Sequence, residues 1–403
     1  AAAIGSGNQE LLQLEGAQLK TNGFRYQSGQ AYGSIGLSAT GGEFFASGTG
    51  FVASIEDDGS GGASGDIVFD KDTGALSLTA ERLAVRVESA FVLSADGVAL
   101  SYDPNGTLDQ TLATVGTAQL NLLFAGGTTG NVSNWAIRQN GFSLGDGTVA
   151  LADLVVDDFL SLTSPALTID SFLYNTGEAL QGTFGIEAIS GVLYPGKKHT
   201  AVGSDGGDAD AWGVSGTFDV KTKSLALTID AFELTVQDAL KVDASGVTLN
   251  YVPGSAANQS LAIVNSPGVT VTPLGIDGSA SKLELRENAF EIESATISGT
   301  GTVQAGSAFG FTNPVVTVTG FGVDYSNGGS TNGTIDLSAE AVQVFSNSET
   351  YGASGTSVSG SLRFEGLDYK GIAFAAGAFE MDIASRVKFT GRDIQFQSKP
   401  ASG

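Results

Sequence analysis

The sequence predicts an all-β protein made of tandem repeats, and an elongated β stack of the solenoid or prism type is the expected architecture. Three observations predict this: apolar and polar residues that alternate, glycine-containing turns at short intervals, and a self-similarity with a period of about 148 residues. Tandem β-sandwich modules are the alternative, because sandwiches and stacks share this spacing of strands.

The alternation has a period of two along most of the chain, as in Leu225, Leu227 and Ile229. This is the pattern of a strand with one buried face, and no segment keeps a helical stripe over three turns. Glycine is abundant, at 57 of 403 residues, whereas there are only 8 prolines. High glycine with low proline favours many short strands joined by glycine turns over a proline-rich linker or a collagen repeat.

The repeat is visible when the sequence is compared with itself. Residues 76–79 (LSLT) recur as residues 225–228 (LALT), and residues 96–104 recur with the same spacing as residues 245–253. Equivalent tyrosines, Tyr102 and Tyr251, lie near the end of the second pair of segments. Small changes in the offset fall in glycine-rich turns, where insertions are tolerated.

The repeat predicts two complete copies flanked by two partial ones. The predicted units are 1–68 (the C-terminal part of a unit), 69–217 and 218–361 (complete), and 362–403 (the N-terminal part of a unit). The seams read as strands rather than spacers, so a connected sheet system is expected instead of independent beads. The chain starts inside a copy and has one Met, Met381, so we expect a processed product or an excerpt.

The charge balance excludes several classes of partner. Nineteen basic and 43 acidic residues give a net charge of −24, which argues against nucleic-acid binding and electrostatic membrane docking. No apolar run is long enough to insert into a bilayer as a helix, and no signal peptide is present. The absence of cysteine removes disulfides, thiolate nucleophiles and thiolate metal sites.

The sequence of the repeats resembles that of giant tandem-repeat surface proteins of bacteria. Residues 232–236, 244–251 and 213–218 are typical of such chains, as are the absent cysteine and the acidic composition. The resemblance covers nearly the whole chain. It implies secretion to the cell surface, an adhesive or structural role, a fibrous or multimeric architecture, and no catalytic residue.

Two acidic loops at the same repeat position are the candidate metal sites. Glu56-Asp57-Asp58-Gly59 and the loop of residues 205–210 offer oxygen ligands in glycine-permitted turns, which suit Ca²⁺. The calcium candidates are Asp57, Asp58, Asp205, Asp208 and Asp210. Neither loop has a full calcium-loop pattern, so the competing interpretation is an acidic turn that protects a sheet edge from aggregation. No other cofactor is expected.

Other candidates have ordinary explanations. His199 lies in a polar turn without an equivalent in the preceding copy, and we expect a solvated loop histidine rather than a general base. Asp157 and Asp158 are expected to be solvent-facing, although such pairs also occur in glycosidases. Trp135 aligns with Leu283 and is expected in the core, whereas Trp212 follows an acidic loop and is expected to be more exposed.

Together these features predict a non-enzymatic extracellular structural protein, a segment of a filament, sheath or surface adhesin. Its partners would be copies of itself or neighbouring repeats of a longer chain. The alternative is a module that binds carbohydrate, such as surface glycans, or calcium. A polysaccharide-active β-solenoid enzyme is a third interpretation, which requires a convergent carboxylate cluster in one copy.

Overall fold

The computed structural model describes most of the chain. The described residues are 2–6, 9–44, 51–56, 62–71, 73–87, 91–107, 109–123, 128–151, 153–156, 158–169, 172–175, 178, 181–204, 213–219, 221–256, 258–326, 329–345, 351–383 and 386–398. Strand accounts for 79% and helix for 1%, which confirms the all-β prediction. Within the described ranges, no helix is long and apolar enough to cross a membrane.

The strands form two antiparallel sheets, of 25 and of ten described strands. Strands of the first half of the chain are β1 (Ala2–Ser6), β2 (Gln9–Glu15), β3 (Gln18–Gln27), β4 (Gln30–Ala39), β5 (Gly41–Phe44), β6 (Phe51–Glu56), β7 (Ala63–Lys71), β8 (Thr73–Val87), β9 (Phe91–Tyr102), β10 (Thr111–Leu122), β11 (Thr128–Arg138), β12 (Gly141–Leu144), β13 (Gly147–Ala150), β14 (Asp153–Val156), β15 (Leu160–Thr163), β16 (Ala166–Ile169), β17 (Phe172–Asn175), β18 (Thr183–Ala188) and β19 (Ser190–Leu193). The later strands are β20 (Thr200–Ser204), β21 (Val214–Asp219), β22 (Leu225–Val236), β23 (Leu240–Tyr251), β24 (Ser260–Asn265), β25 (Gly268–Val271), β26 (Ile276–Ser279), β27 (Lys282–Arg286), β28 (Ala289–Ser298), β29 (Thr302–Ala305), β30 (Phe309–Thr312), β31 (Val315–Asp324), β32 (Ser330–Val344), β33 (Tyr351–Glu365), β34 (Asp368–Ile383) and β35 (Val387–Gln397).

The chain divides into two compact units. The first contains Ala1–Leu154, Ser164–Glu187 and Thr217–Ser224, and the second contains Val155–Thr163, Ala188–Gly216 and Leu225–Gly403. Each unit has its own core of aromatic and aliphatic side chains. In the first, Phe91 packs edge-on against Phe172 and Phe184, and in the second, Phe309, Phe374 and Phe396 form a similar group.

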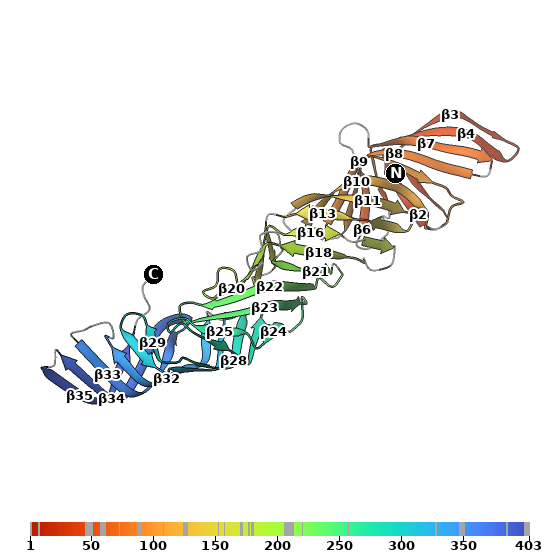
Figure 1. The fold of residues 1–403 in the computed structure, drawn as a ribbon. Helices are drawn as coiled ribbons and strands as arrows, with labels where there is room; N and C mark the ends of the chain where they lie inside the picture. The colour runs from red at the N-terminus through yellow and green to blue at the C-terminus, as the bar shows by residue number, and fades with distance from the viewer. Residues whose placement is uncertain are drawn as a thin grey trace. The chain divides into compact units, whose positions relative to one another are not determined.

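The alternation read from the sequence decides which side chains are buried. In β22, Leu225, Leu227 and Ile229 are buried while Ala226 between them is exposed, because successive side chains of a strand point to opposite faces. β22 lies beside β23 in the green part of the chain, and the apolar faces of both strands line the same core (Figure 1).

The pairing register recurs between the two predicted copies. β8 pairs with β9 so that Leu76 lies opposite Tyr102, and β22 pairs with β23 so that Leu225 lies opposite Tyr251. Both members of the second pair lie 149 residues after those of the first. The two tyrosines thus occupy equivalent positions, as predicted, whereas the repeat boundaries stay a prediction.

An interruption of the ladder recurs with the register. One residue is skipped on each strand, Glu81 and Gly97 in the first hairpin and Asp230 and Gly246 in the second, and the register is the same on both sides. Both glycines have a φ of 62°, a left-handed conformation that glycine adopts without the steric cost that a Cβ imposes. The buried positions of both strands shift by one residue at the interruption, so each strand keeps one face in the core on both sides of it.

The next hairpin of each copy also matches. β10 pairs with β11 and β24 pairs with β27, and the register shifts directly after the first pair in both, Thr111 with Arg138 and Ser260 with Arg286. Trp135 and Leu283 lie at equivalent places in these ladders, and both are fully buried. The prediction that Trp135 belongs to the core is confirmed.

Two glycines, Gly65 and Gly216, each allow a close approach of two strands, and Gly216 gives a first testable prediction. A Cβ at Gly216 would lie 2.0 Å from the carbonyl oxygen of Ala226, and one at Gly65 would lie 2.1 Å from that of Ser77. We expect Gly216→Ala to lower the free energy of unfolding by roughly 1–3 kcal/mol, because the backbone must move to admit the methyl group.

Urea denaturation followed by far-UV circular dichroism measures this effect. Gly352→Ala is the matched control, because Gly352 is an exposed glycine of β33, and a Cβ added there would have no atom within 4 Å. We expect that control to be neutral or slightly stabilising, since alanine restricts the unfolded chain. Equal losses in both variants would contradict the close-approach explanation.

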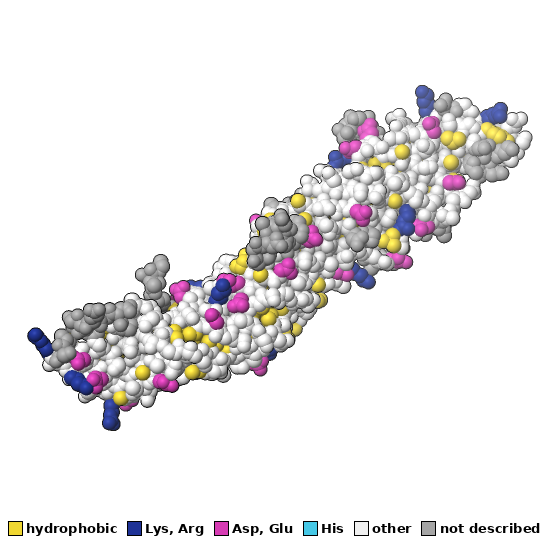
Figure 2. All heavy atoms as spheres, viewed as in Figure 1, with side chains coloured by type: hydrophobic (Ala, Val, Ile, Leu, Met, Phe, Trp, Pro, Cys, Tyr) yellow, Lys and Arg dark blue, Asp and Glu magenta, His cyan; other side chains and the backbone are white. Residues whose placement is uncertain are grey.

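Charged side chains are scattered over the face of the protein seen in Figure 2. Carboxylates outnumber Lys and Arg there, and much of the surface is backbone and neutral polar side chains. Several described carboxylates face a cation across an exposed pair of strands, as in Lys241 with Glu233 at 2.6 Å and Lys388 with Glu380 at 2.6 Å. Such exposed ion pairs contribute little to stability.

Candidate functional site

The calcium candidates cannot be placed, because Asp57, Asp58, Asp205, Asp208 and Asp210 lie outside the described residues. Asp157 and Trp212 also lie outside them, and Asp158 is exposed as expected. Glu56, at the edge of the first acidic loop, forms an ion pair of 3.3 Å with Arg82. Within the described part of the chain, no group of three or more His, Asp or Glu side chains could hold a metal ion.

His199 is buried, so the prediction of a solvated loop histidine is wrong. The side chain has no exposed surface, and neither ring nitrogen has a hydrogen-bond partner among the described residues. Its ring meets that of Phe290 edge-on, with centroids 6.5 Å apart. The turn before it, Pro195–Lys198, is polar and gives no sign of this burial, because the covering side chains come from strands far along the sequence.

A buried tyrosine, Tyr194, and a half-buried one, Tyr325, lie near His199 in the second unit. Tyr194, which precedes the turn, packs against Tyr325 with ring centroids 5.1 Å apart and against Phe290 at 6.4 Å. Tyr194 has a φ of 58°, and its amide donates a hydrogen bond of 2.8 Å to the carbonyl of Phe159. This left-handed residue turns the chain away from β19 and directs its ring into the cluster.

The hydroxyl groups of both tyrosines are directed at backbone carbonyls. Tyr194 Oη lies 2.7 Å from the carbonyl oxygens of Arg286 and Ala289, and Tyr325 Oη donates a hydrogen bond of 2.6 Å to the carbonyl oxygen of His199. The Tyr194 hydroxyl has one proton, so it serves the two carbonyls alternately or shares the proton between them. These bonds fix backbone segments that lie about 90 to 130 residues apart in the sequence.

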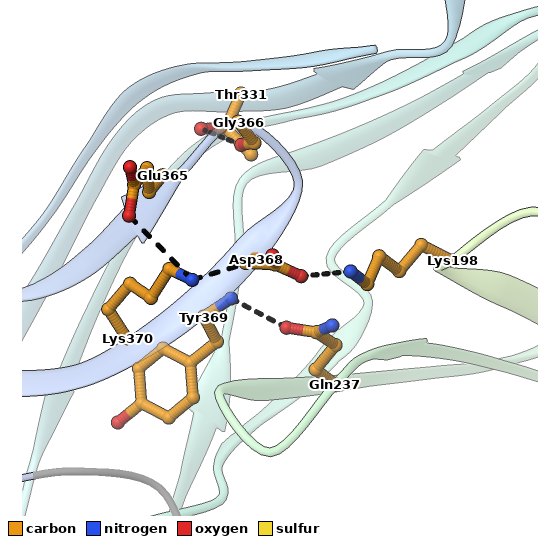
Figure 3. A network of polar contacts seen from close by, with 8 residues as sticks. All are labelled: Lys198, Gln237, Thr331, Glu365, Gly366, Asp368, Tyr369 and Lys370. Carbon is orange, nitrogen blue, oxygen red and sulfur yellow. Dashed lines mark hydrogen bonds and ion pairs between the residues drawn. The ribbon is translucent and has the colours of Figure 1, made fainter. Parts of the chain in front are cut away.

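A polar network continues from this cluster to the turn between β33 and β34 (Figure 3). Lys198 forms an ion pair with Asp368, and Lys370 lies 3.5 Å from Asp368 and 3.7 Å from Glu365. The backbone amide of Tyr369 donates a hydrogen bond of 2.6 Å to Gln237 Oε1, from the turn between β22 and β23. Two turns distant in sequence are thereby tied to the loop that ends at His199.

The electrostatics of this network hold its groups in one protonation state at neutral pH. Burial raises the pKa of Tyr194 and of Tyr325 far above the ordinary value, and it raises the pKa of Tyr369 to about 12. The hydrogen bond from Lys198 lowers the pKa of Asp368. Burial also lowers the pKa of His199. The backbone of Leu367 and the carboxylate of Asp368 raise this pKa, but their effect is smaller than that of burial.

This arrangement connects chain segments and supplies no reacting groups of the kinds sought in the sequence. A general base needs a partner that orients it and a substrate proton within reach, whereas His199 is fully buried with its ring against Phe290. The tyrosines stay protonated and donate to the backbone. We describe the group formed by Tyr194, Lys198, His199, Tyr325 and Asp368 as the tyrosine–histidine junction.

The junction was not identified from the sequence, although one signal of it was present. Phe345 occupies the position of Tyr194 in the next copy: its φ is 57°, and its amide donates a hydrogen bond of 2.8 Å to Ala308, as that of Tyr194 does to Phe159. An aromatic residue recurring after a buried strand marks a packing site. The polar turn beside it concealed that information.

The buried histidine predicts a pH dependence of stability. The folded protein holds His199 neutral, whereas the unfolded chain binds a proton near pH 6.5, so the free energy of unfolding should fall as the pH drops below about 6.5. The loss from this group is at most about 1.4 kcal/mol per pH unit. We expect His199→Gln to remove this component between pH 7 and pH 5.

Urea denaturation at a series of pH values checks this slope. The chain contains a single histidine, so the proton resonances of its imidazole report the folded-state pKa directly. A titration midpoint at or above 6.5 in the folded protein would contradict the expected direction.

Comparison with known proteins gives no relative from which a function could be transferred. No model of a known protein family matches the chain, and no curated protein sequence matches it.

Proposed function

We propose that this chain is a non-enzymatic structural repeat protein of the cell exterior, a segment of a surface fibre, sheath or adhesin. One observation carries the proposal: the two copies repeat their strand pairing residue for residue, with Leu76 opposite Tyr102 and Leu225 opposite Tyr251. Tandem copies with one register are typical of extended structural proteins, in which each copy contacts its neighbours. The expected form is an elongated β stack.

The tyrosine–histidine junction supports this proposal. Its two tyrosine hydroxyls hold the backbone, since Tyr194 and Tyr325 donate to carbonyls of residues distant in the sequence. A chain that transmits load benefits from such cross-connections, because they join turns that strand ladders alone leave free. In this role the alternating apolar residues fill the interior, and the backbone ladders carry tension along the stack.

Electron microscopy with gold-labelled antibodies against the 403-residue chain tests the location and form of the protein. We expect label on intact cells of the producing organism, arranged along fibres or in a continuous layer. Permeabilised cells and an antibody against a cytosolic protein are the controls for leakage. Label that requires permeabilisation would contradict the proposal.

A further inference from the structure

The last strand of the second sheet, β35, has one unoccupied edge. β33, β34 and β35 lie side by side at the blue end of the chain (Figure 1), and β35 pairs with β34 through ten residue pairs from Ala373–Gln397 to Ile383–Val387. Among the described strands, none pairs with the other edge of β35. Unpaired N–H and C=O groups along such an edge are a template for another strand.

The two strands equivalent to β35 show what occupies this edge elsewhere. In β9, residues 91–94 pair with residues 119–122 of β10, and in β23, residues 240–243 pair with residues 268–271 of β25. Both partners pair antiparallel. Residues 119–122 and 268–271 are 149 residues apart in the sequence, and so are residues 91–94 and 240–243. The same kind of segment therefore covers the same edge twice.

The register of β35 identifies the residues that lack this cover. Leu234 lies opposite Val242 in one copy and Met381 lies opposite Phe389 in the next, so Phe389 takes the place of Val242. Val242 has no exposed surface, whereas 51% of Phe389 is exposed. Val387, which takes the place of the fully buried Leu240, is 47% exposed.

A second aromatic residue, Phe345, is also exposed where its equivalent in the other copy is covered. Tyr194 is 1% exposed because it packs on Phe290 and bonds to the backbone of Arg286 and Ala289. Phe345, its equivalent, is 54% exposed. The partners of Tyr194 lie in β27 and β28, which follow β25 in the chain. One continuous segment, β24 to β28, thus covers both positions in the complete copy.

Lysine on an edge strand often serves to block pairing, but here it does not. Lys388 is bound to Glu380 at 2.6 Å, and its equivalent Lys241 is bound to Glu233 at the same distance. Lys241 nevertheless lies in the ladder with Thr270 of β25. The charge of Lys388 is therefore compatible with an added strand on this edge.

We propose that the free edge of β35, with Val387 and Phe389, and the ring of Phe345 form one docking surface for a further repeat of this same sequence type. The occupant is a segment like β24–β28, which adds an antiparallel strand in the register that β25 takes on β23. This inference rests on the proposed repeat architecture and names the partner that extends it.

The test is a cross-link in an extended full-length chain. Residues 254–361 are appended after Pro400, which takes the place of Pro253, and two cysteines are introduced into this otherwise cysteine-free sequence. Val242 lies opposite Val269 in the complete copy. Phe389→Cys combined with Val269→Cys in the appended segment should therefore form a disulfide on mild oxidation, because opposite residues of paired strands have their Cβ atoms within bonding range.

The matched control combines Phe389→Cys with Thr270→Cys in the appended segment, one residue out of register and on the opposite face. We expect the in-register pair to cross-link about tenfold faster or more. Equal rates, or no cross-link in either variant, would overturn the proposal. The location of the protein in the cell does not affect these rates, so failure of the surface-fibre proposal and failure of this one are distinguishable.

Discussion

Leu227→Asp is expected to lower the free energy of unfolding by roughly 4–6 kcal/mol, since it removes a core leucine and places a carboxylate in an apolar interior. Leu227 is 1% exposed and lies opposite Leu249, in the third pair of the β22–β23 ladder. The loss should be local, because each copy of a repeat protein depends mainly on its own interior and on its neighbours. Strands β8 and β9 should be less affected.

Hydrogen exchange resolved by residue measures both the size and the location of this effect. Amides of β22 and β23 should lose protection before those of β8 and β9. Ala226→Asp is the control, because Ala226 is the exposed neighbour on the same strand, and we expect a change below about 0.5 kcal/mol. If β8–β9 lose as much protection as β22–β23, the copies are not energetically local.

Tyr194→Phe should produce the second large effect. The variant keeps the ring against Tyr325 and Phe290 but leaves the part-buried carbonyls of Arg286 and Ala289 without their shared donor. An unsatisfied buried polar group costs roughly 1–3 kcal/mol, and we expect a loss in that range for each carbonyl that no other donor serves. The loss of unfolding free energy should appear in urea denaturation without a change in strand content.

A variant of an exposed tyrosine separates this effect from the loss of a hydroxyl group in general. Tyr26 is 71% exposed, so Tyr26→Phe should leave the stability unchanged. Calorimetry gives an independent measurement of the transition temperatures of both variants. Equal stability of Tyr194→Phe and the parent would show that the two carbonyls find other donors and that the junction does not hold these strands.

Much of the local fold was accessible from the sequence because strands carry their information in short patterns. The alternation in residues 76–79 and 225–228 predicted which side chains are buried, and the offset between them predicted the equivalence of Tyr102 and Tyr251. Aligning Trp135 with Leu283 placed both in the core. These predictions need only the period of a strand and a comparison of the chain with itself.

The junction was inaccessible for the opposite reason. The environment of His199 is set by Phe290 in β28, whose ring meets the imidazole, and by Tyr325 directly after β31, whose hydroxyl bonds to the His199 carbonyl 126 residues away in the sequence. The local sequence, two lysines after a Pro-Gly turn, indicates a solvated loop. Lys198 does remain half-exposed, but its ion pair with Asp368 closes the loop over the histidine. The polarity of the local sequence therefore predicted the wrong environment for His199.

The recurring register also bears on how the chain folds in time. β8 and β22 present the same alternation, interrupted at the same place, so β9 and β23 each meet two strands that satisfy one pairing pattern. At about 5–20 residues per second, the ribosome needs roughly 7–30 s to add the residues that separate the two hairpins, whereas a hairpin forms in roughly 1–10 μs. Synthesis from the N-terminus thus pairs β8 with β9 before a competitor exists. Refolding from denaturant removes that order and exposes the chain to exchange of strands between its own copies.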